Sequence, residues 1–192
     1  MAETRLRLLV VDDDPSLQTS FSLVFRQLGY IVRSASDGFS ALSEMRKGVP
    51  DILLSDLNMR GMSGFELLSV VRRRFPAMPV IAMSGSYSGN DLPLGVAADG
   101  FFQKGSGIER LLRIIAAAPT IKRLSPPPSS AEAPIWIAQN GYDSSGDPYV
   151  TIACPECMRT FPHALGGPIS LINETNCVYC GVSIRCAIAL AQ

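Results

Sequence analysis

The chain has 192 residues, of which 47% are apolar and 18% are charged. This composition is typical of a globular protein and excludes a disordered or collagen-like chain. Lys plus Arg and Asp plus Glu both total 17, so the net charge does not indicate binding to nucleic acid or to an anionic membrane. No apolar run approaches the roughly 20 residues that span a bilayer, and the start of the chain lacks the pattern of a signal peptide. We therefore expect a cytoplasmic protein without a membrane segment.

The two ends of the chain differ in composition, and a proline-rich segment separates them. All five cysteines and the single histidine lie after residue 150. Residues 119–134 include five prolines and three serines, a composition that favours an extended backbone with little to bury. A long surface loop is the alternative, but such loops are uncommon inside compact domains. We therefore predict a first domain at residues 1–118, a linker at 119–134 and a second domain at 135–192.

Strand and helix patterns alternate along the first domain. Short apolar runs predict buried strands at residues 6–11, 30–35, 51–56, 79–85 and 100–104. Apolar residues at helical spacing predict helices at residues 15–28, 39–48, 64–75 and 108–118. Residues 86–99 leave little room for a long helix, because they contain Gly89, Pro93 and Gly95. Strands that are apolar on both faces pack in parallel sheets covered by helices, so we predict an α/β fold with a doubly wound, five-stranded parallel sheet.

Polar side chains follow the predicted strands at the edge where such sheets bind ligands. These acidic, hydroxyl and cationic side chains are Asp12, Asp13, Asp14, Asp56, Ser84 and Lys104. Clustered carboxylates repel one another, and Mg²⁺ relieves that repulsion because it prefers oxygen ligands. A carboxylate can also attack phosphorus to form an aspartyl phosphate, with a metal and an ammonium group stabilising the developing charge.

These motifs make residues 6–118 resemble the receiver domain of two-component response regulators, which has a flavodoxin-like fold. The family's acidic pair matches Asp12 and Asp13 in VVDDDP, and its phospho-accepting aspartate matches Asp56 in LLSDLNMRGMSGFELL. Its switch hydroxyl matches Ser84 in AMSG, and its invariant lysine matches Lys104 in FFQK. The spacing of all four elements agrees with the family.

The resemblance implies further roles for residues around this edge. Mg²⁺ would be held by the acidic pair, by Asp56 and by the backbone carbonyl of Asn58, and Phe101 would be the aromatic switch residue. Asp14 is better explained as a helix N-cap ahead of Pro15 than as a metal ligand. Arg60 and Gly105 stand where the family usually has proline. We expect glycine after Lys104 to loosen the loop that aims this lysine.

The first domain contains no histidine, so it cannot be its own phosphohistidine donor. The phosphoryl group must come from another molecule, and the resemblance implies a sensor histidine kinase or a phosphotransfer protein. We expect a phospho-accepting signalling protein rather than an enzyme, with at most slow hydrolysis of its own aspartyl phosphate.

The second domain carries two C-x₂-C pairs, formed by Cys154 with Cys157 and by Cys177 with Cys180. Four thiolates at this spacing predict a closed structural Zn²⁺ site, and the spacing resembles that of zinc ribbons, which are small and mainly β. A redox-active dithiol is the alternative, but it belongs near a βαβ pattern that is missing here. His163 and Cys186 could each replace a ligand. We instead expect a surface histidine, and a buried cysteine on a short helix.

Residues 135–192 carry only two basic side chains, Arg159 and Arg185, against four acidic ones. Because neutralising phosphates requires clustered Lys and Arg, this charge argues against nucleic-acid binding. The basic run from Arg72 to Arg74 ends a predicted helix, where cations complement the helix dipole, and we expect it to be solvated.

We therefore expect a response regulator whose receiver switches a protein-binding output through a small zinc-stapled module. Two alternatives remain open at this stage. One is a scaffold with a receiver fold that is never phosphorylated, and the other is a transcriptional regulator with a DNA-binding zinc ribbon. The kinase and the output partner are not identified by the sequence.

Overall fold

The computed structural model describes residues 5–87, 96–118, 135–138, 141–142, 144–146, 148–165 and 172–189. Its first part is a five-stranded sheet in the order β2-β1-β3-β4-β5, with every neighbouring pair parallel. The strands are β1 (Arg7–Val11), β2 (Ile31–Ala35), β3 (Ile52–Asp56), β4 (Val80–Ser84) and β5 (Gly100–Gln103). The helices are α1 (Pro15–Gln27), α2 (Gly38–Lys47), α3 (Gly64–Arg74) and α4 (Ile108–Ala117). The predicted doubly wound parallel sheet is confirmed. Most of the segment at 86–99 lies outside the described residues.

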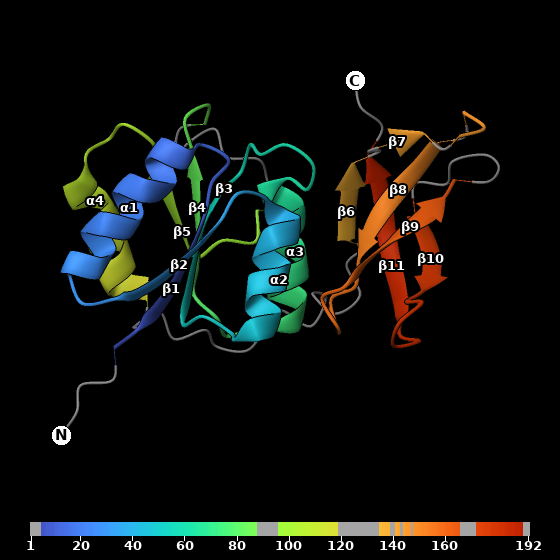
Figure 1. The fold of residues 1–192 in the computed structure, drawn as a ribbon, viewed down its shortest axis with the longest axis horizontal. Helices are drawn as coiled ribbons and strands as arrows, with labels where there is room; N and C mark the ends of the chain where they lie inside the picture. The colour runs from blue at the N-terminus through green and yellow to red at the C-terminus, as the bar shows by residue number, and fades with distance from the viewer. Residues whose placement is uncertain are drawn as a thin grey trace.

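Alternate residues of the central strands pack on opposite faces of this sheet. Leu9 and Leu53 pack on the face covered by α2 and α3, and Leu8 and Leu54 pack on the face covered by α1 and α4 (Figure 1). All four side chains are at most 1% exposed. Burial on both faces explains why the strands are uninterrupted apolar runs in the sequence.

Side-chain caps determine where α1 and α3 begin, as the Asp37 carboxylate does for α2. The Asp14 carboxylate accepts hydrogen bonds from the N–H groups of Ser16 and Leu17, and Pro15 is the first helical residue. The predicted N-cap is therefore confirmed. At α3, the Ser63 hydroxyl accepts from the N–H of Glu66, so this helix starts soon after the end of β3.

The second part of the chain, which we call the C-terminal module, contains two three-stranded sheets. Their orders are β10-β11-β6 and β7-β8-β9. The strands are β6 (Ile135–Ala138), β7 (Gly141–Tyr142), β8 (Pro148–Ala153), β9 (Thr160–Ala164), β10 (Ile172–Asn176) and β11 (Ser183–Ala189). The small, mainly β module agrees with the predicted fold class.

The short helix predicted around Cys186 is wrong, because this segment is strand β11. It pairs antiparallel with β10 and parallel with β6. Ile184 and Cys186 are fully buried, while Arg185 between them is half-buried and pairs with Glu174. This alternation has the period of a strand, and the run is too short for its apolar content to distinguish strand from helix in the sequence.

The C-terminal module lies against helix α3 (Figure 1). Strand β6 contacts α3, and most of the buried residues described in the module belong to the same apolar cluster as the α2–α3 face of the sheet. Arg74 Nε donates to the carbonyl oxygen of Glu156 at 3.1 Å, and the two side chains form an ion pair at 3.5 Å. Packing is therefore continuous from the receiver sheet into the module.

The expectation that the basic run at the end of α3 is solvated is wrong for Arg72, although Arg74 is exposed. Arg72 is only 8% exposed, and its guanidinium donates to the carbonyl oxygens of Pro76, Met78 and Ala97. It also pairs with Asp99 at 2.8 Å. Arg72 therefore ties the end of α3 to the segment that enters β5.

Among the described residues, no helix is both long and apolar enough to cross a bilayer.

We predict that Arg72→Ala destabilises the fold by about 3–5 kcal/mol, because it leaves the buried Asp99 carboxylate without its cation. Urea unfolding followed by circular dichroism measures this difference. The matched control is Arg113→Ala on the exposed side of α4, which should change the stability by less than about 0.5 kcal/mol. Equal effects of the two substitutions would contradict the role given to Arg72.

Candidate functional site

The acidic residues predicted from the sequence meet at the carboxyl ends of β1 and β3. Carboxylate oxygens of Asp12, Asp13 and Asp56 all lie within 4.8 Å of one another. Asp12 is 0% exposed and Asp56 is 4% exposed. They converge because the parallel pairing of β1 with β3 aligns the ends of the two strands.

Lys104 joins this group from the end of β5. Its Nζ lies 2.9 Å from a carboxylate oxygen of Asp12 and 2.9 Å from one of Asp56. Its backbone N–H donates to the carbonyl oxygen of Ser84 at 2.8 Å, which fixes the loop after β5 to the end of β4. Gly105, the next residue, has φ +87°, a left-handed conformation that glycine adopts without strain.

The pKa values of these groups reflect burial opposed by ion pairing. Burial raises the pKa of Asp56, and Asp12 adds to this effect, while Lys104 and the backbone N–H of Asn58 act in the opposite direction. For Lys104, burial alone would lower the pKa, but hydrogen bonds and charge attraction to the two carboxylates outweigh it and raise the pKa. The site therefore keeps a cation beside two carboxylates that are largely removed from water.

One carboxylate oxygen of the acidic group lacks, in the described part of the chain, a partner that a further cation could supply. Asp56 Oδ1 is buried and has no hydrogen-bond partner among the described residues. Such an atom is costly unless a ligand satisfies it. Three clustered carboxylates match the oxygen ligands that Mg²⁺ prefers, so the residues present fit the predicted ion.

The remaining predicted receiver residues lie on or just after the neighbouring strands β3, β4 and β5. Ser84 is fully buried at the end of β4, and its Oγ accepts from the N–H of Ser86 at 3.0 Å. Phe101 is half-buried on β5 and packs against the α2–α3 apolar cluster. Asn58 is the second residue after the end of β3 and is exposed. Strands β3 and β4 thus bring Asn58 and Ser84 to the edge with the acidic group, whereas Phe101 lies further back on β5, paired with Ala82.

Two features of this site were missed by the sequence analysis. Arg60 forms an ion pair with Asp13 at 3.9 Å while its side chain remains 97% exposed. Its guanidinium therefore lies beside the acidic group on the solvent side. A Cβ at Gly64 would lie 1.9 Å from the carbonyl oxygen of Asp56 and 2.6 Å from Leu57 Cα, so glycine allows α3 to start against the backbone of Asp56. In the sequence, the only indication of this close approach is that Gly64 comes directly after the Ser63 cap.

The four predicted cysteines also form one group. The Sγ atoms of Cys154, Cys157, Cys177 and Cys180 all lie within 4.8 Å of one another. Two of the S–S distances, Cys154–Cys180 and Cys157–Cys177, are 3.7 Å. This is close to the edge of a tetrahedron with Zn–S bonds of about 2.3 Å. Neither His163 nor Cys186 belongs to this group in the described part of the chain.

The turns of the two cysteine pairs have the same hydrogen-bond pattern. The N–H groups of Met158 and Gly181 donate to the carbonyl oxygens of the first cysteine in each pair. The N–H of each first cysteine donates in turn to the carbonyl oxygen five residues later. Met158 and Gly181 occupy equivalent positions, with φ +55° and φ +73°. Gly181 adopts this left-handed conformation without strain.

The thiols of the two pairs differ in acidity. Burial raises the pKa of Cys154 to about 12. Burial opposes ionisation of Cys177 as well, but the N–H groups of Tyr179 and Cys180 and the neighbouring thiols outweigh it and lower its pKa to about 7. Four thiolates so close together need a cation between them, which a closed Zn²⁺ site would supply.

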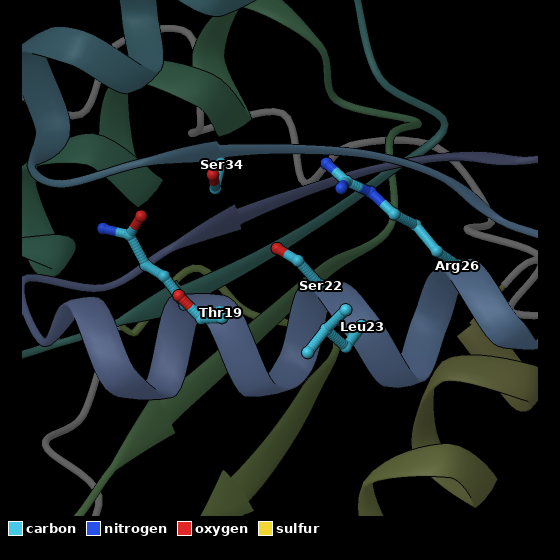
Figure 2. A pocket seen from close by; sticks show the side chains of 6 residues that line it. Thr19, Ser22, Leu23, Arg26 and Ser34 are labelled. Atoms are coloured by element: carbon cyan, nitrogen blue, oxygen red, sulfur yellow. The ribbon is translucent and has the colours of Figure 1, made fainter.

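A separate polar hollow of about 210 Å³ lies between α1 and β2. Figure 2 shows Thr19, Ser22, Leu23 and Arg26 along α1 and Ser34 opposite them on β2. The Arg26 guanidinium donates to the carbonyl oxygen of Val32, so this cation holds the helix to the strand. The hollow contains none of the residues singled out from the sequence.

The parallel sheet and the buried acidic group with its lysine define a receiver-type signalling domain. Residues 8–116 match the response regulator receiver domain family, and the chain belongs to this family. The match ends before the four cysteines.

Relatives among characterised proteins are response regulators. The chain is 34% identical over 92 residues to the probable transcriptional regulatory protein TcrX of Mycobacterium tuberculosis, covering 48% of this chain and 39% of that protein. It is 35% identical over 106 residues to the DNA-binding response regulator MtrA of Mycolicibacterium smegmatis, covering 54% and 46%. The chain thus spans less than half the length of these relatives.

Solved structures share the receiver fold. The chemotaxis response regulator CheY4 of Vibrio cholerae is 30% identical with a TM-score of 0.56, over 60% of this chain and 99% of that one. The response regulator TrrA of Thermotoga maritima, solved in complex with Mg²⁺-BeF, is 27% identical with a TM-score of 0.55, over 59% and 98%.

We predict that Met158→Gly stabilises the zinc-loaded protein by about 1 kcal/mol, because a left-handed conformation costs a residue with a Cβ about 1–2 kcal/mol. Gly181→Ala, at the equivalent position of the other turn, should destabilise it by a similar amount. Thermal unfolding of the three proteins at equal zinc content provides the measurement. A stabilising Gly181→Ala would show that the two turns are not equivalent.

Proposed function

We propose that this response regulator accepts a phosphoryl group on Asp56 from a sensor histidine kinase or a phosphotransfer protein. The single observation that carries the proposal is the buried Asp56 carboxylate, with one oxygen paired to Lys104 and the other unpartnered among the described residues. An Asp56 oxygen would form the new O–P bond as the N–P bond of the donor phosphohistidine breaks. The leaving imidazole nitrogen keeps the electron pair and takes up a proton.

Mg²⁺ would be held by Asp12, Asp13 and Asp56 and by the backbone carbonyl of Asn58. The clustering of the three carboxylates supports this assignment, as does the Mg²⁺-BeF complex of the related TrrA. The ion supplies neutralisation of the negative charge that phosphoryl transfer brings to the site.

The Lys104 ammonium and the Ser84 hydroxyl would both respond to the negative charge of the new phosphoryl group. Lys104 already lies 2.9 Å from an Asp56 oxygen, so it would donate to a phosphoryl oxygen with a small shift. Ser84 at the end of the adjacent strand would turn its hydroxyl toward the phosphoryl group, which would draw in the loop after β4. Phe101, half-buried on β5, would then move inward. The surface around β4 and β5 would change as a result.

The four-cysteine group would hold a structural Zn²⁺ that staples the C-terminal module. Among the described strands of this module, none is longer than seven residues, so a core alone would be marginal and a metal adds folding free energy. We propose that the module, residues 135–192 beyond a linker at 119–134, delivers a protein-binding output. Its only Lys or Arg residues are Arg159 and Arg185. So few cations do not support DNA binding by this module, although the related MtrA is described as a DNA-binding response regulator.

We predict that wild-type protein gains one phosphoryl group when incubated with acetyl phosphate and Mg²⁺, and that Asp56→Asn gains none. Intact-mass spectrometry measures the addition. Asp14→Asn is the matched control, because Asp14 is a neighbouring carboxylate that caps α1, and it should be labelled as wild type is. Absence of label on a folded wild-type protein would favour the unphosphorylated scaffold.

We predict one Zn²⁺ per chain, measured by native mass spectrometry. Cys157→Ser should lose the ion and unfold the module, since a structural site needs all four thiolates. Cys186→Ser is the control, because Cys186 is a buried cysteine of the same module outside the group of four. Zinc loss in Cys186→Ser with retention in Cys157→Ser would contradict the proposed ligand set.

A further inference from the structure

The side of α3 that points away from the receiver sheet is buried. Leu68 and Val71 pack in the core beneath the sheet face. Because an α-helix has about 3.6 residues per turn, Glu66 lies on the opposite side of α3, and Val70 lies toward that opposite side. Nevertheless, Glu66 is 2% exposed and Val70 is 0% exposed. An isolated receiver would leave this side in water, so another part of the chain must cover it.

The C-terminal module provides this cover. Strand β6 contacts α3 and lies beside it in Figure 1. One turn beyond Val70, the charges of Arg73 and Arg185 interact across the same contact, and Arg74 reaches Glu156 at the edge of the contact. We call the surface formed by Glu66, Val70 and Arg73 the outward face of α3.

A carboxyl group is an unusual choice for such a contact. Both carboxyl oxygens of Glu66 are buried, and neither has a hydrogen-bond partner among the described residues. Burial raises the pKa of Glu66 to about 8, so the group is mainly neutral at pH 7. The charged side chains that α3 and the module bring to this contact are Arg73, Arg74, Glu156 and Arg185, and none of them offsets the burial of Glu66.

We propose that the outward face of α3 is a proton-dependent docking surface for the C-terminal module. The module stays docked while the Glu66 carboxyl is protonated, because a neutral carboxyl costs far less to bury than a carboxylate. Ionisation of Glu66 favours an open arrangement in which water reaches the carboxylate. This inference goes beyond the proposed function, because it requires no phosphoryl transfer.

The direction of the pH dependence follows from linkage. Docking raises the pKa of Glu66 from the ordinary value of 4.5 to about 8, so the docked arrangement binds the proton more tightly. Docking is therefore strongest below the ordinary pKa and weakens as the pH rises toward 8. Between the two pKa values, the docking constant should fall about tenfold per pH unit.

The first test is a carbon-13 NMR titration of the glutamate carboxyls in the zinc-loaded full chain, with Glu66→Gln identifying the Glu66 signal. Glu109 is the matched control position, because it is exposed in the first turn of α4, whereas Glu66 is buried in the first turn of α3. We expect Glu66 to titrate at least two pH units above the ordinary glutamate pKa of 4.5. A Glu66 signal that titrates at the ordinary value would overturn the proposal.

The second test measures docking by small-angle X-ray scattering at roughly pH 6 to 9, a range that spans the raised pKa of Glu66. Wild type and Glu109→Gln should expand as the pH rises, whereas Glu66→Gln should stay compact throughout. A wild-type protein that stays equally compact at every pH would overturn the proposal.

A third variant separates burial by the module from burial by the receiver itself. Val70→Arg places a charge in the contact, so the protein should be expanded at every pH and the pKa of Glu66 should fall to the ordinary value of 4.5. A high pKa of Glu66 in an expanded Val70→Arg protein would show that the receiver alone buries the carboxyl, and the proposal would then be wrong.

Discussion

The charge interaction of Lys104 with two buried carboxylates is the constraint on which the rest of the receiver depends. Asp12 and Asp56 are almost fully removed from water, and without a cation their mutual repulsion and lost hydration would oppose folding. The sheet order places β1 and β3 side by side, so the carboxylates must converge. The lysine has to reach them from β5, and its loop is held to β4 by one backbone hydrogen bond. The Lys104 ammonium group therefore contributes both to the stability of the receiver and to the proposed phosphoryl transfer.

Much of the receiver could be predicted because its information is local. Buried strands read as apolar runs, and the Asp14 cap and the strand-end positions of Asp56 and Lys104 follow from short motifs. Contacts between distant segments were not accessible in this way. Arg72 was expected in water because nothing near it in the sequence shows that Asp99, 27 residues away, is its partner. The cysteine spacing predicted the cluster, but not the strand that contains Cys186.

Helix α3 connects the two parts of the chain physically. Its first residue, Gly64, abuts the backbone of Asp56, and its outward face with Glu66 and Val70 contacts the C-terminal module. A helix transmits displacement along its axis because its backbone hydrogen bonds keep it rigid. A phosphoryl group at one end and a proton on the outward face would thus act on the same rigid element. This contact would couple the receiver to the module directly.

The apolar cluster shared by the sheet and the C-terminal module means that the boundary seen in the sequence is not a boundary in packing. A fragment ending at residue 118 would keep every strand of the receiver sheet, yet it would uncover Val70, which is fully buried in the whole chain. Uncovered apolar side chains on one helix face invite association between copies. Self-association of the isolated receiver would then reflect a missing partner rather than a native dimer, so truncated fragments are a poor guide to the oligomeric state of this protein.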